Sequence, residues 1–364
     1  MKHYFQKHDG QLLSKKAARR LILILFCIIF VVFTFKINQV EKTELVSREG
    51  QTFEKATVVE ILQDNLQADG TRVGEQRVVV KMDTGERKGE ELTVTSSSGY
   101  LFGAGCTPGM HVVVMQSVAG ESVIASVYSQ DREWVIYIFA ALYILLLCVI
   151  GGKQGIKGSA GLIFTFFCVI FVYLPLVYRG LSPFWAAVFV CAITTVVTMY
   201  LIGGPTKKTV VSILGTMLGV LCAGISAQLF SLLSGITGYN VSDIETLMTL
   251  WNTNRIQVGG LLFSGLLISS MGAVMDVAMS ISSSMSEILK QNPDMTRKEL
   301  FKAGIHVGRD MMGTDSNTLI LAFAGSSVSM LLLDYAYNLP YQQIINSNNI
   351  GIAIMQGLSG SFGI

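Results

Sequence analysis

The sequence predicts a mainly α-helical transmembrane bundle of seven spans plus a partial eighth, with a small all-β, OB-like domain outside the membrane. Three observations predict this class. Half of the 364 residues (51%) are hydrophobic, and only 14% are charged. The apolar residues fall in blocks close to the roughly 20 residues with which a helix crosses about 30 Å of hydrocarbon. Residues 38–132 have instead the mixed composition of a soluble domain.

The first apolar block follows a basic tail, residues 1–20, and we expect residues 21–37 to form the first transmembrane helix, with its apolar part at residues 21–35. A cleaved signal peptide is the alternative, because a short apolar block after basic residues has this appearance. No pair of small residues with cleavage-site spacing follows, since the chain continues Thr34-Phe35-Lys36-Ile37-Asn38. An uncleaved anchor is therefore the prediction.

Six further blocks are long enough to span within residues 133–364, which we take as the polytopic domain. They lie at residues 134–150, 159–178, 184–202, 210–233, 258–281 and 317–335. A last apolar stretch, residues 351–364, is too short to cross the hydrocarbon. We therefore expect the sequence to end inside its final helix and the intact protein to be longer.

Lysine and arginine predict the orientation, because they are enriched in short cytoplasmic loops and tails. With the N-terminus inside, fifteen of these residues fall on the cytoplasmic side, and only Arg179 and Arg255 fall in the outer short loops. The fifteen are Lys2, Lys7, Lys15, Lys16, Arg19, Arg20, Lys153, Lys157, Lys207, Lys208, Lys290, Arg297, Lys298, Lys302 and Arg309. This bias predicts a multi-pass protein of the bacterial cell membrane, with residues 41–132 outside the cytoplasm.

Residues 38–132 contain five short runs rich in β-branched residues, separated by Asp-Gly, Asp-Thr-Gly and Ala-Gly-Glu turn signals. The runs lie at residues 53–62, 76–82, 92–96, 111–115 and 122–128. Five short strands predict a small barrel, for which the OB fold is the candidate. A row of stacking aromatics, which would favour single-stranded nucleic acid, is absent from the sequence. A structural cap or a protein-docking module is the plainer interpretation.

Asp276 is an acid inside an otherwise apolar block. A charge at the bilayer centre costs about 2.5 to 3.5 kcal/mol on insertion scales, so such an acid is by default a hypothesis about an ion or substrate path. Counting from the start of its block, Asp276 falls toward the cytoplasmic third, and an interfacial or snorkelling acid is the alternative. We expect Gly215, Gly219 and Gly272 to allow close approach of helices.

After Asp276 the chain is expected to leave the membrane and return. Thr296 followed by Glu299 has the spacing of a capping box, which predicts a helix start. Arg309, Asp310 and Asp315 are expected to meet Asp276 at the inner mouth of a pathway, because paired charges are less costly to bury. Solvated salt pairs are the alternative. Asn317 and Thr318 then re-enter the membrane, and Asp334 near the outer end of that span is a candidate exit-side partner.

Other chemistry has little support in the sequence. Five of six cysteines lie in predicted spans and only Cys106 lies outside, so the outer domain has no second thiol for a disulfide. No paired-cysteine, His-Glu-x-x-His or Gly-x-Ser-x-Gly motif occurs. The glycine-rich stretches 151–155 and 203–209 do not match a phosphate-binding loop. We therefore predict no catalytic residue, metal, cofactor or nucleic-acid partner, and no enzyme.

Two stretches of sequence resemble a known family: Met271-Gly272-Ala273-Val274-Met275-Asp276-Val277-Ala278-Met279-Ser280-Ile281, and Gly308-Arg309-Asp310-Met311-Met312-Gly313-Thr314 with Asn317-Thr318-Leu319 after it. They look like the signature stretches of the YibE/F family of multi-pass bacterial membrane proteins, and the similarity covers nearly the whole chain. The resemblance implies a final additional span and a role in transport or efflux. Asp315 departs from the family pattern, in which an apolar residue follows Gly313-Thr314.

The layout is also similar to that of proton-driven exporters of the SecD/SecF and RND type, which is an analogy of layout only. The function we expect is an ion-coupled secondary transporter or permease, with the lipid bilayer and a transported solute or ion as partners. The alternative is a non-transporting scaffold whose outer domain, residues 41–132, recruits envelope proteins. An intramembrane enzyme is a third hypothesis, for which no nucleophile and base pair stands out.

Overall fold

The computed structural model describes residues 25–40, 50–97, 103–119, 122–241, 244–254 and 256–364. The basic tail, residues 1–20, and Arg255 therefore lie outside the described residues. The chain divides into two compact units, one formed by Lys42–Leu146 and the other by Met1–Glu41 with Leu147–Ile364. We call them the barrel unit and the helical unit. The division falls inside a helix, fourteen residues beyond the end of the expected outer domain at residue 132.

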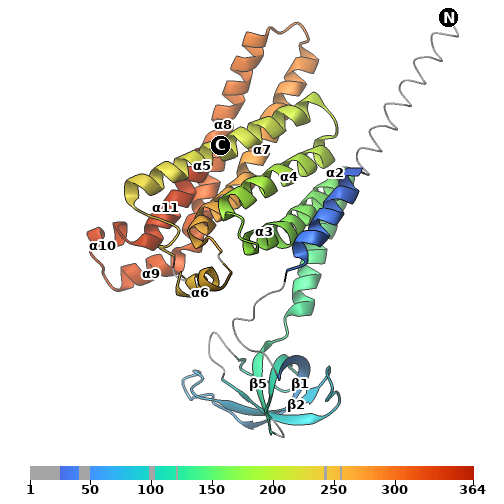
Figure 1. The fold of residues 1–364 in the computed structure, drawn as a ribbon, viewed down its shortest axis with the longest axis vertical. Helices are drawn as coiled ribbons and strands as arrows, with labels where there is room; N and C mark the ends of the chain where they lie inside the picture. Colours follow the sequence, from blue (N-terminus) through green and yellow to red (C-terminus); the bar gives the residue numbers. More distant parts are fainter. Residues whose placement is uncertain (1–24, 41–49, 98–102, 120–121, 242–243, 255) are drawn as a thin grey trace, which may run out of the picture. The chain divides into compact units, whose positions relative to one another are not determined.

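Five strands form a closed barrel in the order β1-β2-β3-β5-β4 (Figure 1). They are β1 (Gln51–Gln63), β2 (Gln76–Met82), β3 (Glu91–Ser96), β4 (His111–Ala119) and β5 (Ser122–Gln130). All five expected strands are present, and β1, β4 and β5 extend a few residues beyond their expected ends. Only the β3–β5 pair is parallel, and β1 closes the barrel against β4 along residues 51–57.

The barrel interior follows from alternation along the strands. In β2, Val78, Val80 and Met82 are buried while Arg77 and Lys81 are exposed, as expected where one strand face packs on a core. Val58 and Val114 fill the same interior from β1 and β4. The register of the strands is thereby fixed, since a shift by one residue would turn each apolar set outward.

The first turns of helix α2 (Glu133–Cys168) follow directly after β5 in the barrel unit. Lys55 of β1 is held between two acids there: its Nζ lies 3.3 Å from Asp131 Oδ2 and also pairs with Glu133. Asp131 in turn accepts a hydrogen bond of 3.0 Å from the backbone N–H of Glu133. The helix thus begins at a polar cap that is tied to the barrel wall.

The long apolar stretch from α2 through η1 (Val169–Tyr173) and α3 (Leu174–Tyr178) reverses direction at Gly152. Gly152 has φ 52° and ψ −128°, a conformation that only glycine adopts at low cost. A Cβ added to Gly155 would overlap the carbonyl group of Leu147, and Cys148 Sγ lies 3.9 Å from Ser159 Oγ. In one straight helix, residues eleven apart would be separated by about 16 Å. The chain therefore folds back on itself here.

The N-terminal helix, Leu25–Asn38, packs on this second arm in the helical unit. The Phe30 and Phe164 rings lie 5.5 Å apart between their centroids, and Asn38 donates a 2.7 Å hydrogen bond to the Phe171 carbonyl. Arg179 donates to the carbonyl oxygens of Lys36, Ile37 and Gln39 at 2.6, 3.0 and 2.8 Å, respectively. This guanidinium caps the end of the helix, where carbonyl groups lack helical partners.

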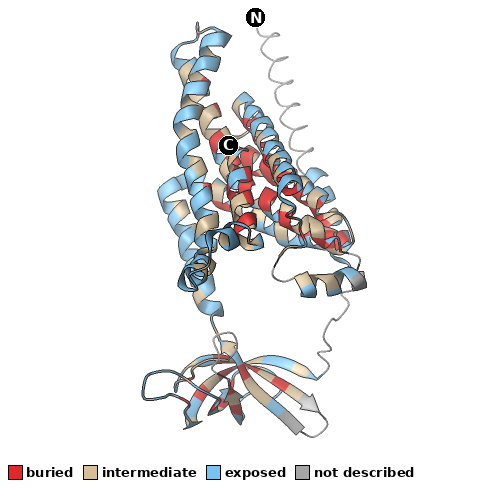
Figure 2. Ribbon diagram, turned by 90° about the vertical axis from the view of Figure 1, so that its left-hand side faces the viewer, coloured by how far each residue is buried: buried red, intermediate tan, exposed pale blue. Residues whose placement is uncertain are grey.

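The core of the helical unit is formed by α4 (Pro183–Gly203), α5 (Lys207–Ser234) and α7 (Leu261–Gln291), and Figure 2 shows its buried residues gathered inside the bundle. Leu266 and Leu267 of α7 are almost fully buried. Several buried hydroxyls bond to nearby backbone, as when Thr194 donates to the Val190 carbonyl at 2.7 Å, whereas those of Thr195 and Thr198 have no partner among the described residues. Bonding to the backbone is favoured where no water is available.

Shorter elements complete the unit: α6 (Ile244–Asn254), η2 (Val258–Gly260), α9 (Val328–Ala336), α10 (Tyr341–Ile345) and α11 (Asn348–Ser361). Helix α8 (Arg297–Ser326) begins with the expected capping box, because Thr296 accepts from the Glu299 N–H and Glu299 accepts from the Thr296 N–H. The expected exit from the membrane and re-entry along this segment stay a prediction. Residues 297–326 form one continuous helix, which bends by 59° only at Ser327.

Four helices of the described residues are long and apolar enough to cross a membrane, or five if α8 and the bent-off α9 count together. They are Glu133–Tyr178, Pro183–Gly203, Lys207–Ser234 and Val258–Gln291. This number is lower than the expected seven. The difference has two sources. The sequence pattern counts two spans in residues 133–178, where the length criterion counts one helix. It also counts residues 21–35 as a span, and the described part of that segment, Leu25–Asn38, is too short for the criterion.

Candidate functional site

Helix α7 presents two different faces. Leu266, Leu267, Val274 and Val277 are buried against the bundle. Gly265, Ser269, Gly272 and Asp276 recur every three or four residues on the opposite side and are exposed. Residues with this spacing share one helix face. We call these four the α7 strip; it is a small and polar surface on a helix that is otherwise apolar.

The depth of Asp276 follows from how α7 packs on α5. A Cβ on Gly215 would lie 3.5 Å from Ala278 Cβ, and one on Gly219 would overlap Val274, so the two helices run antiparallel. Asp276 consequently lies level with residue 217, about 5 Å from the middle of α5 at 1.5 Å per residue. The interfacial or snorkelling position stays the alternative.

Asp315 is the residue that the fold brings toward Asp276. Gly304 of α8 faces Met285 of α7, and Gly308 faces Ile281 at 3.4 Å from its would-be Cβ. Asp315 lies seven residues beyond Gly308 on the same face, and its charge interacts with that of Asp276. The two carboxylates, on neighbouring helices, thus lie within range of each other's charge. A proton or a small cation between them would remove their repulsion.

Arg309 and Asp310, which were expected to meet Asp276 with Asp315, form no ion pair with it in the described part of the chain. Both side chains are exposed on α8, and neither belongs to an ion pair among the residues that the structure describes. Asn317 and Thr318 are exposed as well, and the Thr318 hydroxyl donates back to the Thr314 carbonyl at 3.0 Å. Arg309 and Asp310 follow Gly308 by one and two residues, and Asn317 follows Asp315 by two, so these three lie on other faces of α8 than Gly308 and Asp315.

Asp334 lies in α9, beyond the bend at Ser327, nineteen residues after Asp315. Its Oδ2 is shielded from solvent and has no hydrogen-bond partner in the described part of the chain. A shielded carboxylate oxygen without a partner is costly. Asp334 thus lies on a different helical segment from Asp276 and Asp315, and its carboxylate is partly shielded from solvent there.

The expected packing glycines have different surroundings. Gly219 lies against Val274 and the Gly363 carbonyl, and Gly215 lies in contact with Ala278. Gly272 has no atom within 4 Å of its would-be Cβ, so it does not pack against a neighbouring helix in this chain. The α7 strip turns Gly272 outward together with Asp276, which is why sequence spacing alone misplaced it.

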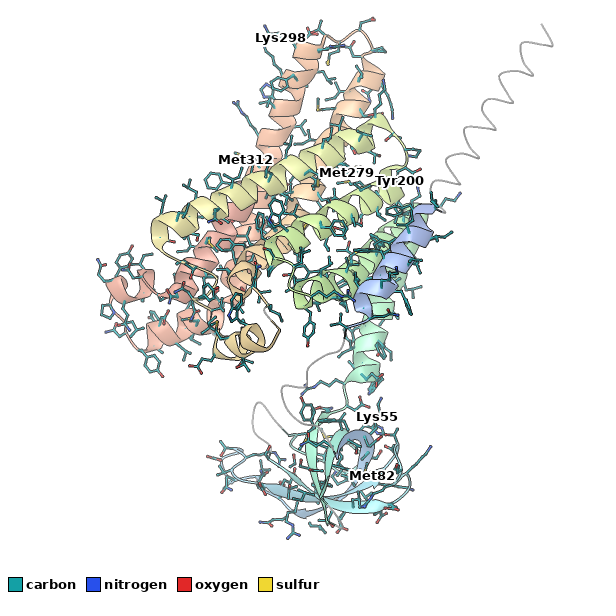
Figure 3. The ribbon with its side chains drawn as sticks, viewed as in Figure 1. Lys55, Met82, Tyr200, Met279, Lys298 and Met312 are labelled. Atoms are coloured by element: carbon teal, nitrogen blue, oxygen red, sulfur yellow. The ribbon has the colours of Figure 1, made fainter. Side chains whose placement is uncertain are left out.

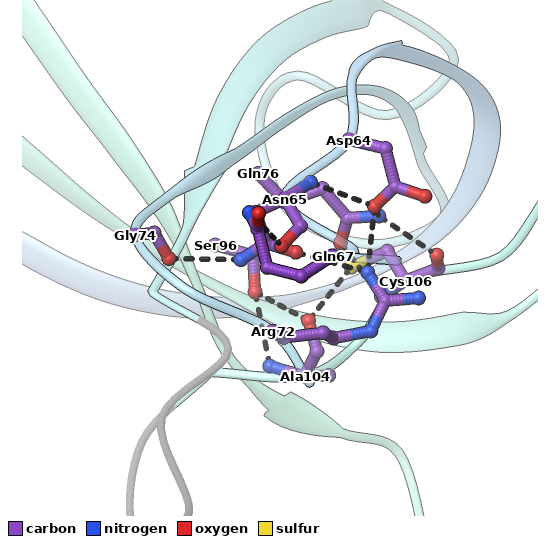
Figure 4. Close-up of polar contacts among 9 residues, drawn as sticks. All are labelled: Asp64, Asn65, Gln67, Arg72, Gly74, Gln76, Ser96, Ala104 and Cys106. Carbon is purple, nitrogen blue, oxygen red and sulfur yellow. Dashed lines mark hydrogen bonds and ion pairs between the residues drawn. The ribbon is translucent and has the colours of Figure 1, made fainter. Parts of the chain in front are cut away.

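A polar network in the barrel is a feature that motif reasoning missed (Figure 4). Arg72 Nη1 contacts Asp64 Oδ1 at 2.6 Å, and buried Gln76 exchanges hydrogen bonds with the Cys106 backbone at 2.8 and 3.1 Å. Ser96 holds Ala104 through both its carbonyl and its N–H. The network is satisfied internally and fastens residues 103–106 to the barrel. The Asp64-to-Arg72 spacing around the Asp69-Gly70 turn was its only sequence signal.

Arg72 also changes the pKa of an acid in this network, Asp64. Its hydrogen bond to Asp64, helped by the backbone N–H groups of Asn65 and Leu66, lowers the pKa of that carboxyl below 3.8. Burial raises the pKa of the Cys106 thiol above its ordinary value, so the thiol is held protonated and unreactive. No group of three His, Cys, Asp or Glu side chains within the described ranges is arranged to hold a metal ion.

The apolar helices of the helical unit define the class: this chain is a multi-pass membrane protein with a small five-stranded barrel. Residues 139–364 match the family model described as YibE/F-like protein. The chain belongs to the YibE/F-like family, and the resemblance seen in the sequence is confirmed. The match contains Asp276 and Asp315 but not the barrel. No curated protein matches the chain. No solved structure matches it either.

Proposed function

We propose that this protein is an ion-coupled secondary transporter or permease of the bacterial cell membrane. The observation that supports the proposal is the Asp276–Asp315 pair, two acids on facing helices near the depth of the middle of α5. Intramembrane acids are costly and typically belong to ion paths or proton relays. Binding of a proton or a small cation at the pair would favour one arrangement of α7 and α8 over another.

The α7 strip supports the same proposal. Gly265, Ser269 and Gly272 lead along α7 to Asp276 without bulky side chains. A path lined by small residues and ending at a carboxylate admits water or an ion more readily than a row of leucines would. Arg309, Asp310, Asn317 and Thr318 then lie on the exposed side of α8, where they are candidates for the mouth of the path rather than for its gate. Asp334 is the candidate on the far segment.

The distribution of lysine and arginine supports a topology of seven spans with the N-terminus in the cytoplasm. The antiparallel packing of α5 on α7 puts Lys207, Lys208 and Lys290 at one end of the helical unit, and Lys298 lies at the tip of the α7–α8 hairpin (Figure 3). Arg179 lies at the end where the N-terminal helix terminates. Seven spans result when the N-terminal helix, each of the two arms around Gly152 and the α8–α9 pair are added to α4, α5 and α7. Helix α11 is then the partial eighth. The barrel then lies outside the cytoplasm, and its strand order supports the OB-like assignment.

The proposal is tested by Asp276→Asn in the full-length protein, reconstituted in vesicles that enclose a pH-sensitive dye. Asparagine keeps the volume and most of the hydrogen bonding but cannot ionise. We expect proton flux under an imposed gradient in the parent protein and at least a tenfold loss in the variant. Asp294→Asn in the α7–α8 turn is the matched control and is expected to keep the parent flux. Parent and Asp276→Asn proteins that are equally silent under proton and sodium gradients would contradict the coupling role.

A scaffold is the second candidate, favoured by one feature of the barrel. Phe53 of β1 and Tyr128 of β5 form an edge-to-face pair with centroids 5.2 Å apart, and both rings are exposed. Exposed aromatic residues are enriched in protein interfaces. In this alternative, residues 41–132 recruit envelope proteins, and the membrane part is an anchor. A scaffold would tolerate Asp276→Asn and lose function on Phe53→Ser with Tyr128→Ser, whereas a transporter would show the reverse. Neither candidate requires a chemical reaction or a cofactor.

A further inference from the structure

A large apolar groove lies on the opposite side of α5 from the features used above. Its volume is about 1580 Å³. The N-terminal helix, the second arm of α2, the end of α4 and the first turns of α5 enclose it, so it lies wholly within the helical unit. Aromatic rings form much of its wall: Phe26, Phe30, Phe164, Phe167 and Phe171. We call it the Phe groove.

The walls of the Phe groove are joined mainly at one end. At that end Asn38 and Arg179 tie the N-terminal helix to the second arm by hydrogen bonds. Toward the other end, Phe26 and Val31 of the N-terminal helix face the groove and remain substantially exposed, as do Val210 and Val211 of α5. An apolar cleft of this size between membrane-spanning helices is suited to hydrocarbon chains rather than water.

Charge and polar groups gather at that second end of the Phe groove. Thr206, Lys207 and Thr209 line it, and Tyr200 lies there at the end of α4 (Figure 3). The Lys207 side chain is exposed and forms no ion pair with any described acid. Lys207 is also the first residue of α5, where the partial positive charge of the helix adds to that of the ammonium group. Tyrosine is itself enriched at membrane interfaces.

The rest of this end has the same sign. Lys208 follows Lys207 in sequence. Lys153 and Lys157 come just after the Gly152 turn, and this part of α2 lies beside the end of α4 because Gly161 contacts Thr198. No described Asp or Glu lines the groove. A hydrophobic cleft with a cationic mouth is complementary to an amphiphile with an anionic head.

We propose that the Phe groove binds an anionic phospholipid, with its acyl chains among the phenylalanine rings and its phosphate at Lys207. The hydroxyls of Thr206 and Thr209 are available beside that phosphate, although they already contact one another at 2.9 Å. The lipid would fill the space between the N-terminal helix and α5, and so join the first helix to the bundle along its length. This site is independent of the Asp276–Asp315 pair and does not depend on transport.

The test uses the purified full-length protein, stripped of lipid in detergent and titrated with phosphatidylglycerol or phosphatidylcholine of matched chains. Bound lipid is counted by native mass spectrometry. We expect the parent protein to prefer phosphatidylglycerol and Lys207→Gln to weaken its binding about fivefold, the size of one lysine–lipid charge contact. Lys298→Gln, at the tip of the α7–α8 hairpin and outside the groove wall, is the matched control and should bind like the parent.

A second variant tests the groove rather than the charge. Val196→Trp should fill part of the cavity and reduce retention of both lipids, while an unchanged size-exclusion profile reports that the protein folds. Equal binding of the two lipids by the parent, or full binding by Lys207→Gln, would overturn the proposal. So would lipid retention by Val196→Trp, since the lipid would then lie elsewhere. Disulfide-linked dimers through Val211→Cys would assign the groove to a second copy of the chain instead.

Discussion

Gly219 and Gly272 have the same residue type and lie in helices that pack on each other, yet their surroundings are opposite. Gly219 lets α5 approach both α7 and the end of the chain at Gly363, with Val274 filling the remaining space. Gly272 faces open space on the α7 strip. A close contact at glycine depends on which face the partner occupies, and this is decided by the packing of the whole bundle.

This contrast gives a prediction for a matched pair of substitutions. Gly219→Ala should destabilise the protein by about 1 to 3 kcal/mol, because its methyl group would overlap Val274 and the Gly363 carbonyl. Gly272→Ala should be neutral or slightly stabilising, since alanine favours a helix over glycine by up to about 1 kcal/mol. Thermal unfolding in one detergent would measure both. Equal melting temperatures for the two variants would contradict the packing of α5, α7 and α11 described above.

At the scale of single elements, the β1–β2 loop of the barrel is ordered by its acids. Asp64 is paired with Arg72, and Asp69 accepts hydrogen bonds from the Thr71 hydroxyl and N–H at 2.7 and 2.9 Å. These hydrogen bonds lower the pKa of both carboxyls from 3.8. The loop is therefore bound most firmly when both acids are ionised.

The sign of the resulting pH dependence follows from linkage. A carboxyl whose pKa is lowered in the folded state stabilises that state above the unfolded pKa, and this stabilisation is lost as the pH falls through the folded pKa. The loop should thus be insensitive to pH above about 5 and should loosen below about 4. Carboxyl carbon NMR titration of the aspartate-labelled protein would follow each acid.

Arg72→Gln provides the control for this titration. It should raise the pKa of Asp64 toward its ordinary value, because the largest cause of the shift is removed, and it should leave Asp69 unchanged. An Asp64 midpoint that is the same in both proteins would show that the ion pair does not form in solution.

On the scale of the whole molecule, the described cations other than those of the barrel gather mainly at one end of the helical unit. The contacts of Gly161 with Thr198 and of Gly203 with Thr209 put Lys153 and Lys207 near the end of α4, and Lys298 lies at the tip of the α7–α8 hairpin (Figure 3). Arg179 lies at the other end of the unit. Since positive residues are enriched on the cytoplasmic side, this arrangement predicts that this end of the helical unit faces the cytoplasm.

Labelling of single cysteines in a cysteine-free background would check that direction. Cysteines replacing Lys153, Lys208 and Lys298 should react with an impermeant maleimide only from the cytoplasmic side, and Leu181→Cys only from outside. Reaction of Lys153→Cys and Lys208→Cys from opposite sides would mean that an odd number of spans separates them, and it would contradict the two spans proposed there.

Much of the fold was predictable because strong local signals specify it. Alternating β-branched residues located the five strands, and apolar blocks located α4, α5 and α7 to within a few residues, except that α7 continues ten residues further. The Thr296–Glu299 spacing located the start of α8. These features depend on neighbours in sequence, so a single sequence contains them. The helix α6 and the bend at Ser327 were missed, because neither follows a change in hydropathy.

The candidate site was only partly predictable, and the difference is one of helix rotation. The sequence by itself determined that Asp276 lies in an apolar helix, that a five-stranded domain precedes the bundle, and that the chain resembles the YibE/F-like family. Tertiary structure alone decided that the charge of Asp315 reaches Asp276 while Arg309 forms no described ion pair with it, that Gly219 packs and Gly272 does not, and that a groove opens at Lys207. Each of these depends on which faces of distant helices meet, and helix contacts are fixed by the packing of the complete bundle rather than by residue spacing.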